Sequence, residues 1–179
     1  YYKVRALNVD NIATSYNTAR STHTEAVVPG AVTFAAVWQS SVTINIAADT
    51  NSAGTQYSVE ASTGNNGNYR EFYSGNYVTN VSSTGLSANT TYYYRVRARS
   101  FDNIWTSYNT EKSTHTMAAA PNAIASFSMV GVSSVTVTLG ADNNTTGTQY
   151  SIEASTGVNT AYGVIFTGNF PTTYTHIGL

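Results

Sequence analysis

Two segments of this chain recur at a spacing of about 92 residues, and no other feature constrains the fold as strongly. Residues 1–24 match residues 93–116, with 17 of 24 positions identical. Residues 42–86 match residues 135–179, with 22 of 45 positions identical. A period of this length in a chain of 179 residues predicts small domains joined in tandem.

The phase of the repeat divides the chain into three units. One complete repeat occupies residues 25–116. Residues 1–24 correspond to the last two strands of a preceding repeat, and residues 117–179 correspond to the first five strands of a following one. Short linkers at Thr24–Pro29 and Thr116–Pro121 are expected to join the units, and the proline in each linker stiffens the joint.

Apolar and polar residues alternate along several segments, and a period of two is typical of half-buried β-strands. Clear examples are Val42–Ile46, Tyr57–Glu60 and Tyr92–Arg99. Runs rich in Gly, Asn, Ser and Thr separate these segments as turns do. The sequence therefore predicts an all-β fold of two-sheet sandwiches, with about seven strands in each repeat. The residues predicted to share the core are Tyr57, Val59, Tyr94, Val96 and Ala98.

The segment that begins at Leu86 reads L-S-A-N-T-T-Y-Y-Y-R-V-R-A and resembles the fibronectin type III pattern L-x-P-x-T-x-Y-x-[YF]-x-V-x-A. The resemblance implies tandem immunoglobulin-like sandwiches in which the Tyr92 hydroxyl bonds back to the backbone before its strand, as a tyrosine corner. Ala88 replaces the family's proline, which should loosen that turn. Ile46 replaces a common core tryptophan, so Trp38 or another aromatic residue should fill the volume. The resemblance implies binding, spacing or assembly and does not imply catalysis.

Composition excludes several classes of partner and site. The net charge of −1 provides no field that would attract nucleic acid. No stretch reaches the roughly 20 apolar residues of a membrane-spanning helix, so we expect no membrane insertion. The chain contains no cysteine, which excludes disulfides and thiolate metal sites.

No residues have the spacing of a catalytic or metal site. His23 and His115 lie at predicted strand ends without recognisable partners, and are expected to be solvated. Asp49 and Asp142 lie in turns rich in Asn and Thr, where aspartate caps its own backbone more often than it binds calcium. Glu60 is expected to form an exposed ion pair with an arginine of the neighbouring strand. We therefore predict no catalytic residue, no cofactor and no metal.

Two further groups of residues are candidates for contact or modification. Exposed tyrosines can stack on sugars or contact proteins, although ordinary sheet packing explains them as well. These tyrosines are Tyr69, Tyr73, Tyr77 and Tyr93. The N-x-[ST] sequons, which are glycosylation acceptors only in a secreted protein, are at Asn80, Asn89, Asn143 and Asn144.

The partial repeats predict head-to-tail assembly, because residues 1–24 of one copy would complete the sandwich begun by residues 117–179 of the next. The side chains expected at this interface are Tyr2, Val4, Arg5 and Ala6 of one copy with Tyr150, Ile152 and Glu153 of the other. The same strands would pair without polymerisation if the chain is a window cut from a longer polypeptide.

The leading hypothesis is therefore a structural repeat unit of an extracellular or cell-surface filament, stalk or layer. Its partners would be copies of itself, with glycans or other surface proteins as further candidates. The alternatives are a spacer or carbohydrate-binding accessory module of a large secreted enzyme, and an arm of an adhesin.

Overall fold

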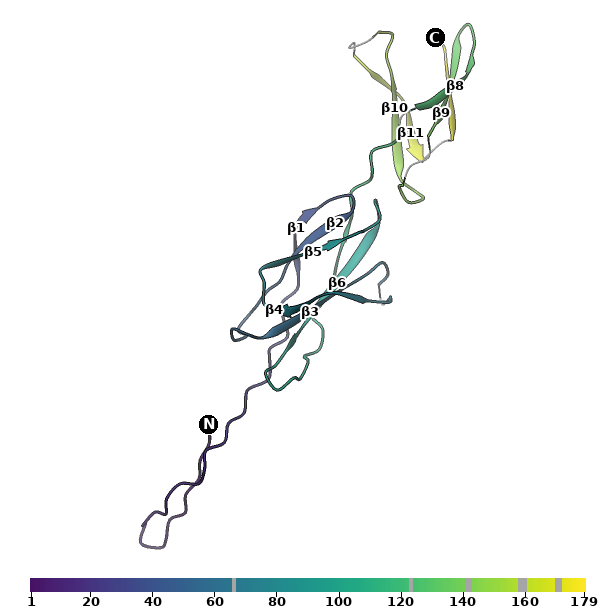
Figure 1. Cartoon of the computed structure of the whole chain (residues 1–179). Coiled ribbons are helices and arrows are strands. Elements are labelled where there is room, and N and C mark those ends of the chain that lie inside the picture. The colour runs from purple at the N-terminus through teal and green to yellow at the C-terminus, as the bar shows by residue number, and fades with distance from the viewer. Residues whose placement is uncertain (66, 123, 141–142, 158–160, 170–171) are drawn as a thin grey trace.

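The computed structural model describes residues 1–179 except 66, 123, 141–142, 158–160 and 170–171. The chain is elongated, with a two-legged hairpin at the N-terminal end, a complete sandwich in the middle and five strands at the C-terminal end (Figure 1). The all-β prediction is confirmed. Among the described residues, no helix is long and apolar enough to cross a membrane.

The middle sandwich consists of seven antiparallel strands in two sheets. One sheet has the order β1-β2-β5, formed by Thr33–Val37, Ser41–Asn45 and Asn80–Thr84. The other has the order β4-β3-β6-β7, formed by Arg70–Asn76, Gln56–Ser62, Thr91–Arg99 and Lys112–His115.

The core lies between these two sheets and contains the residues predicted from the alternation. Tyr94, Val96 and Ala98 on β6 are fully buried. Val96 is paired with Val59 on β3, and Ala98 is paired with Tyr57. A fully buried side chain of the size of Val96 stabilises the fold by roughly 1.5–3 kcal/mol. The register prediction for the core is confirmed.

Aromatic residues other than Trp38 fill the core volume. Trp38 is 60% exposed because it lies in the tight turn after β1, where its amide donates to the Ser41 carbonyl. Phe34 and Phe72 instead pack edge-on against the Tyr94 ring, with centroids 5.8 and 6.1 Å away. Of the two alternatives, Trp38 or aromatic residues elsewhere, the second is therefore the correct one.

The tyrosine corner is present at the predicted position. The Tyr92 hydroxyl accepts a hydrogen bond of 2.9 Å from the Ser87 amide. Ala88, in the place of proline, is 8% exposed. The Thr116 hydroxyl donates to the Ser87 carbonyl at 2.6 Å, and the Thr90 hydroxyl donates to the Ala88 carbonyl at 2.9 Å. Side-chain hydrogen bonds therefore hold the turn that a proline would stiffen.

Replacing Tyr94 by phenylalanine should raise the free energy of unfolding by about 1 kcal/mol, because its buried hydroxyl makes no hydrogen bond of good geometry. Burial raises the pKa of Tyr94 to about 12, and the Ser83 hydroxyl only partly offsets the rise. The folded state therefore favours the neutral phenol. Below the unfolded pKa of 10.0 both states hold the neutral phenol, and as pH rises toward 12 the unfolded chain loses this proton first, so the free energy of unfolding falls. Urea unfolding at pH 7 and pH 11 checks both effects; a less stable variant at pH 7 would contradict them.

The C-terminal end forms a half-sandwich, which we define as β8–β12. One sheet has the order β12-β9-β8, formed by Thr173–Ile177, Ser134–Leu139 and Ile124–Val130. The other contains β10 and β11, formed by Gln149–Ala154 and Gly163–Asn169. These pairings repeat β5-β2-β1 and β3-β4 of the middle sandwich. In the described part of the half-sandwich, no strand pairs with the second edge of β10.

Candidate assembly interface

Residues 1–24, here called the N-terminal hairpin, have the same local structure as residues 93–116 of the middle sandwich. The Val4 amide donates to Asn17 Oδ1 at 2.7 Å, and the Val96 amide donates to Asn109 Oδ1 at 2.7 Å. The Ala6 amide also donates to Thr14 Oγ1 at 3.0 Å, and the Ala98 amide donates to Thr106 Oγ1 at the same distance. Local hydrogen bonds therefore hold the hairpin in shape without a sheet beside it.

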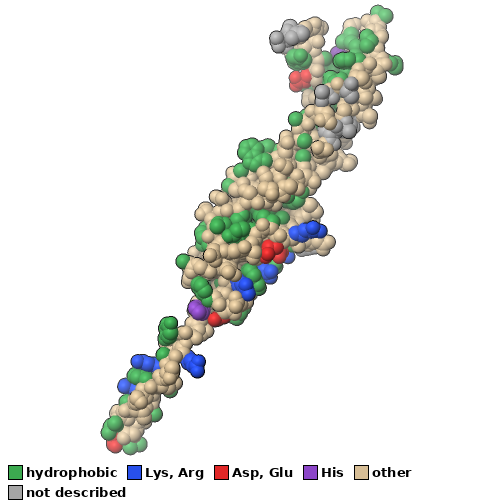
Figure 2. Space-filling view, viewed as in Figure 1, with side chains coloured by type: hydrophobic (Ala, Val, Ile, Leu, Met, Phe, Trp, Pro, Cys, Tyr) green, Lys and Arg blue, Asp and Glu red, His purple; other side chains and the backbone are tan. Residues whose placement is uncertain are grey.

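The two hairpins differ in what covers them. Tyr94 and Val96 are fully buried, whereas the matching Tyr2 and Val4 are 74% and 70% exposed. Ala6 is exposed too. Figure 2 shows hydrophobic side chains exposed along this slender end of the molecule. The N-terminal hairpin thus presents to solvent the face that its counterpart buries in a core.

The half-sandwich contains an apolar cavity of about 300 Å³ between its two sheets. Among the residues that line it are Phe127, Val135, Val137, Ile152 and Ile165. Phe127 is 63% exposed, although it pairs with Val137 as the half-buried Phe34 pairs with Ile44. The cavity therefore lies where the middle sandwich has its packed core.

Two predicted interface residues are less open than expected. Tyr150 and Ile152 are each 8% exposed, because both sheets of the half-sandwich still contribute to their surroundings. Their counterparts Tyr57 and Val59 are 1% and 0% exposed. The prediction that the inward face of β10 stands open was therefore wrong for these two side chains, and the exposed surface lies at the cavity and at the free edge of β10.

The ion pair on the outer face of the middle sandwich is more enclosed than expected. Glu60 is only 9% exposed and accepts bonds of 2.7 and 2.9 Å from Arg95. The Arg95 guanidinium lies 3.7 Å from the Tyr69 ring centroid and 3.8 Å from that of Tyr108. Glu153, the counterpart of Glu60, is exposed. The expectation of an exposed Glu60 was wrong, because aromatic rings from a loop and from the segment before β7 cover it.

The arrangement of seven strands in two sheets, closed by the Tyr92 corner, decides the fold. The fold is fibronectin type III-like. Solved structures similar to it include several fibronectin type III domains.

Three of the similar structures illustrate how far the similarity extends in identity, TM-score and coverage. The fourth FNIII domain of a human protein is 17% identical, with a TM-score of 0.49, and the match covers 66% of this chain and 98% of that domain. An Fn3-like protein from Clostridium thermocellum is 24% identical, with a TM-score of 0.42, over 49% of this chain and 90% of that one. A multidomain titin fragment is 21% identical, with a TM-score of 0.45, over 51% of this chain and 32% of the fragment. No protein-family model matches the sequence, and no curated protein matches it either.

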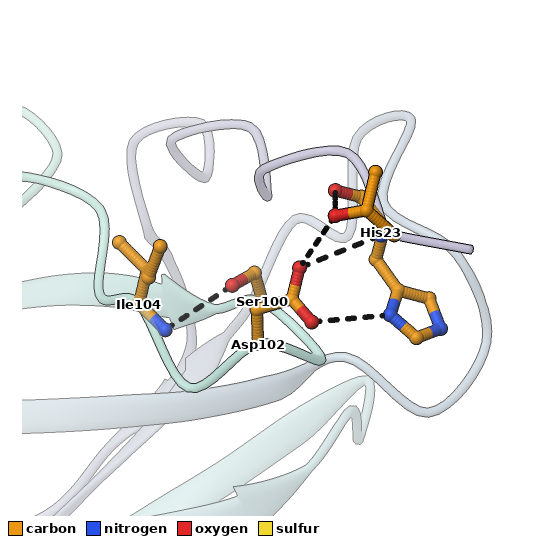
Figure 3. Close-up of polar contacts among 5 residues, drawn as sticks. His23, Ser100, Asp102 and Ile104 are labelled. Carbon is orange, nitrogen blue, oxygen red and sulfur yellow. Dashed lines mark hydrogen bonds and ion pairs between the residues drawn. The ribbon is translucent and has the colours of Figure 1, made fainter. Parts of the chain in front are cut away.

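His23 is not simply solvated as expected. Its Nδ1 lies 3.3 Å from Asp102 Oδ1, in the hairpin tip of the fibronectin type III-like middle sandwich (Figure 3). Its ring packs on Phe101 with centroids 5.1 Å apart. The hydrogen bond from His23 lowers the pKa of Asp102. His115, the matching residue one repeat later, is exposed as predicted.

Asp49, which was expected to cap its own turn, bonds to a distant segment instead. Asp49 has a φ of 51° and accepts a hydrogen bond from the distant Gly30 amide, so it ties the incoming linker to the sandwich. Asp142 lies outside the described residues. Within the described part of the chain, no three His, Cys, Asp or Glu side chains gather as metal ligands would.

The candidate tyrosines are mostly engaged in the fold. Tyr69 stacks on Arg95, and Tyr73 donates its hydroxyl to the Asn76 carbonyl. The Tyr77 ring lies 5.5 Å from that of Tyr57. Tyr93, the remaining candidate, is half-buried. These positions favour packing roles over an open platform for sugars.

The four sequons fall into two groups. Asn89 donates its amide to Thr148 Oγ1 at 2.6 Å, and Asn144 donates to the Ala119 carbonyl at 2.9 Å. A glycan on either nitrogen would replace one of these hydrogen-bond donors. Asn80 and Asn143 are exposed.

Proposed function

We propose that the chain is a structural repeat unit of an extracellular assembly, joined head to tail. The N-terminal hairpin of one copy would complete the half-sandwich of another. The observation that carries the proposal is that the hairpin keeps the hydrogen bonds of its buried counterpart while Tyr2 and Val4 stay uncovered. An extracellular location agrees with the fold, since fibronectin type III domains are common in extracellular proteins.

The pairing of β3 with β6 gives the register of the proposed joint. Val59 pairs with Val96 and Tyr57 with Ala98, so the repeat would pair Ile152 with Val4 and Tyr150 with Ala6. Glu60 pairs with Arg95, and the matching contact would join Glu153 to Lys3 of the other copy. Backbone pairing along the free edge of β10 would supply the hydrogen bonds, as in other cases of strand addition.

Apolar burial would supply most of the stabilisation at the joint. Tyr2 and Val4 would enter the half-sandwich at the positions that Tyr94 and Val96 occupy in the middle sandwich. A valine-sized side chain contributes roughly 1.5–3 kcal/mol when fully buried. The outer face of the hairpin is already arranged, since Lys3 and Arg5 lie 4.1 and 4.9 Å from the Tyr16 ring centroid. Little reordering would therefore be needed on docking.

The two complementary surfaces lie at opposite ends of the elongated chain (Figure 1). A contact between two different surfaces does not close on itself unless the rotation between copies forms a ring, so it would generate a filament. The same strands would pair within a longer polypeptide that repeats this unit. The proposal therefore concerns the pairing of strands and assigns no catalytic role to His23, His115, Asp49 or Glu60.

Deleting residues 1–24 tests the proposal. The intact chain should sediment as a concentration-dependent series of oligomers, while the deletion variant should remain a monomer. Adding a synthetic peptide of residues 1–24 to the variant should slow hydrogen exchange at the β10 amides. Filaments formed by the deletion variant, or exchange at β10 that the peptide leaves unchanged, would refute the proposal.

A further inference from the structure

The N-terminal hairpin is attached to the middle sandwich by a small polar cluster. Asp102, at the tip of the β6–β7 hairpin, contacts the His23 ring through Oδ1 at 3.3 Å. Its Oδ2 accepts from the Thr22 hydroxyl and the His23 amide, both at 3.4 Å. The Ile104 amide donates a hydrogen bond of 3.1 Å to Ser100 Oγ, within the turn that carries Asp102 (Figure 3). We call this contact of His23 with Asp102 the clasp.

The clasp joins two successive repeats rather than two parts of one repeat. His23 ends the hairpin that precedes the middle sandwich, and Asp102 belongs to the last hairpin of that sandwich. The repeat places His115 where His23 stands and Asp10 where Asp102 stands. Both His115 and Asp10 are exposed in the chain.

The linkers on the two sides of the middle sandwich are held in the same way. In the first, the Val27 amide donates to Asn51 Oδ1 at 2.7 Å, and the Asn51 amide returns a bond of 2.9 Å to the Val27 carbonyl. In the second, Ala119 and Asn144 form the same two bonds, at 2.6 and 2.9 Å. In both joints, therefore, matching hydrogen bonds hold the linker against the repeat that follows it.

From this equivalence we infer that Asp10 of one copy forms a clasp with His115 of the copy it completes. The inference rests on the proposed function, because Asp10 reaches His115 only if its hairpin fills the half-sandwich that follows residue 116. The Thr114 hydroxyl would take the place of Thr22, and Val9 would lie beneath the imidazole in place of Phe101. Being exposed, the clasp adds little affinity and instead selects the orientation of one repeat on the next.

Cysteine cross-linking tests the clasp, since the chain has no cysteine of its own. An Asp10→Cys chain and a His115→Cys chain should form a covalent dimer with a short bis-maleimide when mixed, and neither should do so alone. The doubly substituted chain His23→Cys/Asp102→Cys calibrates the reach, because it should cross-link within one molecule.

A second pair of cysteine variants distinguishes the clasp from the strand pairing of the joint. Lys3→Cys and Glu153→Cys chains should also cross-link on mixing, and they report only the strand pairing. Dimers from the Lys3 and Glu153 pair without dimers from the Asp10 and His115 pair would overturn the clasp and leave the proposed function standing. Dimers from neither pair would overturn both.

Discussion

Replacing Val4 by aspartate should abolish association between copies and leave the middle sandwich folded, whereas the same replacement at Val96 should unfold that sandwich. Val96 is fully buried opposite Val59. An unpaired carboxylate in such a core costs more than about 4 kcal/mol, which is most of the stability of a small domain. Val4 is 70% exposed, so an aspartate there should change the stability of the unassembled chain very little. The cost arises only when the hairpin must enter a second copy.

Thermal unfolding by circular dichroism and sedimentation velocity separate the two outcomes. Val4→Ile is the matched control and should still associate, because it keeps an apolar side chain of similar shape. A Val4→Asp chain that associates as tightly as the unchanged protein would show that the hairpin does not enter a core. Loss of the middle-sandwich transition in that variant would show that Val4 supports its own chain instead.

Replacing Glu60 by alanine should lower the unfolding free energy of the middle sandwich by about 2–3 kcal/mol. The change leaves the Arg95 guanidinium between Tyr69 and Tyr108 without its carboxylate partner. It also removes the acceptor of the Tyr108 hydroxyl. Arg95 is partly solvated, which keeps the loss below that of a fully buried pair.

Glu153→Ala provides the internal comparison, because Glu153 occupies the same position one repeat later and is exposed. It should leave the unfolding of the middle sandwich unchanged within about 0.5 kcal/mol. Denaturant titration of both variants under conditions that prevent association gives the comparison. Equal effects of the two changes would mean that the rings around Arg95 do not protect the ion pair.

Local pattern was sufficient for the strands and for the core register. A period of two places Tyr94, Val96 and Ala98 on one face of β6, and this assignment needs no knowledge of distant contacts. The Tyr92 corner was expected from the resemblance to the fibronectin type III pattern, and its partner Ser87 lies five residues earlier in the chain.

Environments that depend on distant segments were not predictable from the same patterns. Glu60 alternates as a solvent-facing residue should, yet a ring from Tyr108, 48 residues later, covers it. His23 has no partner at any recognisable spacing because Asp102 lies 79 residues away. Trp38, a large aromatic residue considered for the core, is 60% exposed in the structure.

The repeat, the strands and the apolar face of each strand could be read from the sequence, since these follow from spacing along a single extended backbone. Which of those apolar faces are covered depends on the three-dimensional arrangement of the sheets. The N-terminal hairpin and residues 93–116 have nearly the same sequence and the same hydrogen bonds, yet Val96 is buried and Val4 is exposed. Burial depends on whether a second sheet lies against the strand, and no pattern within the strand records its presence.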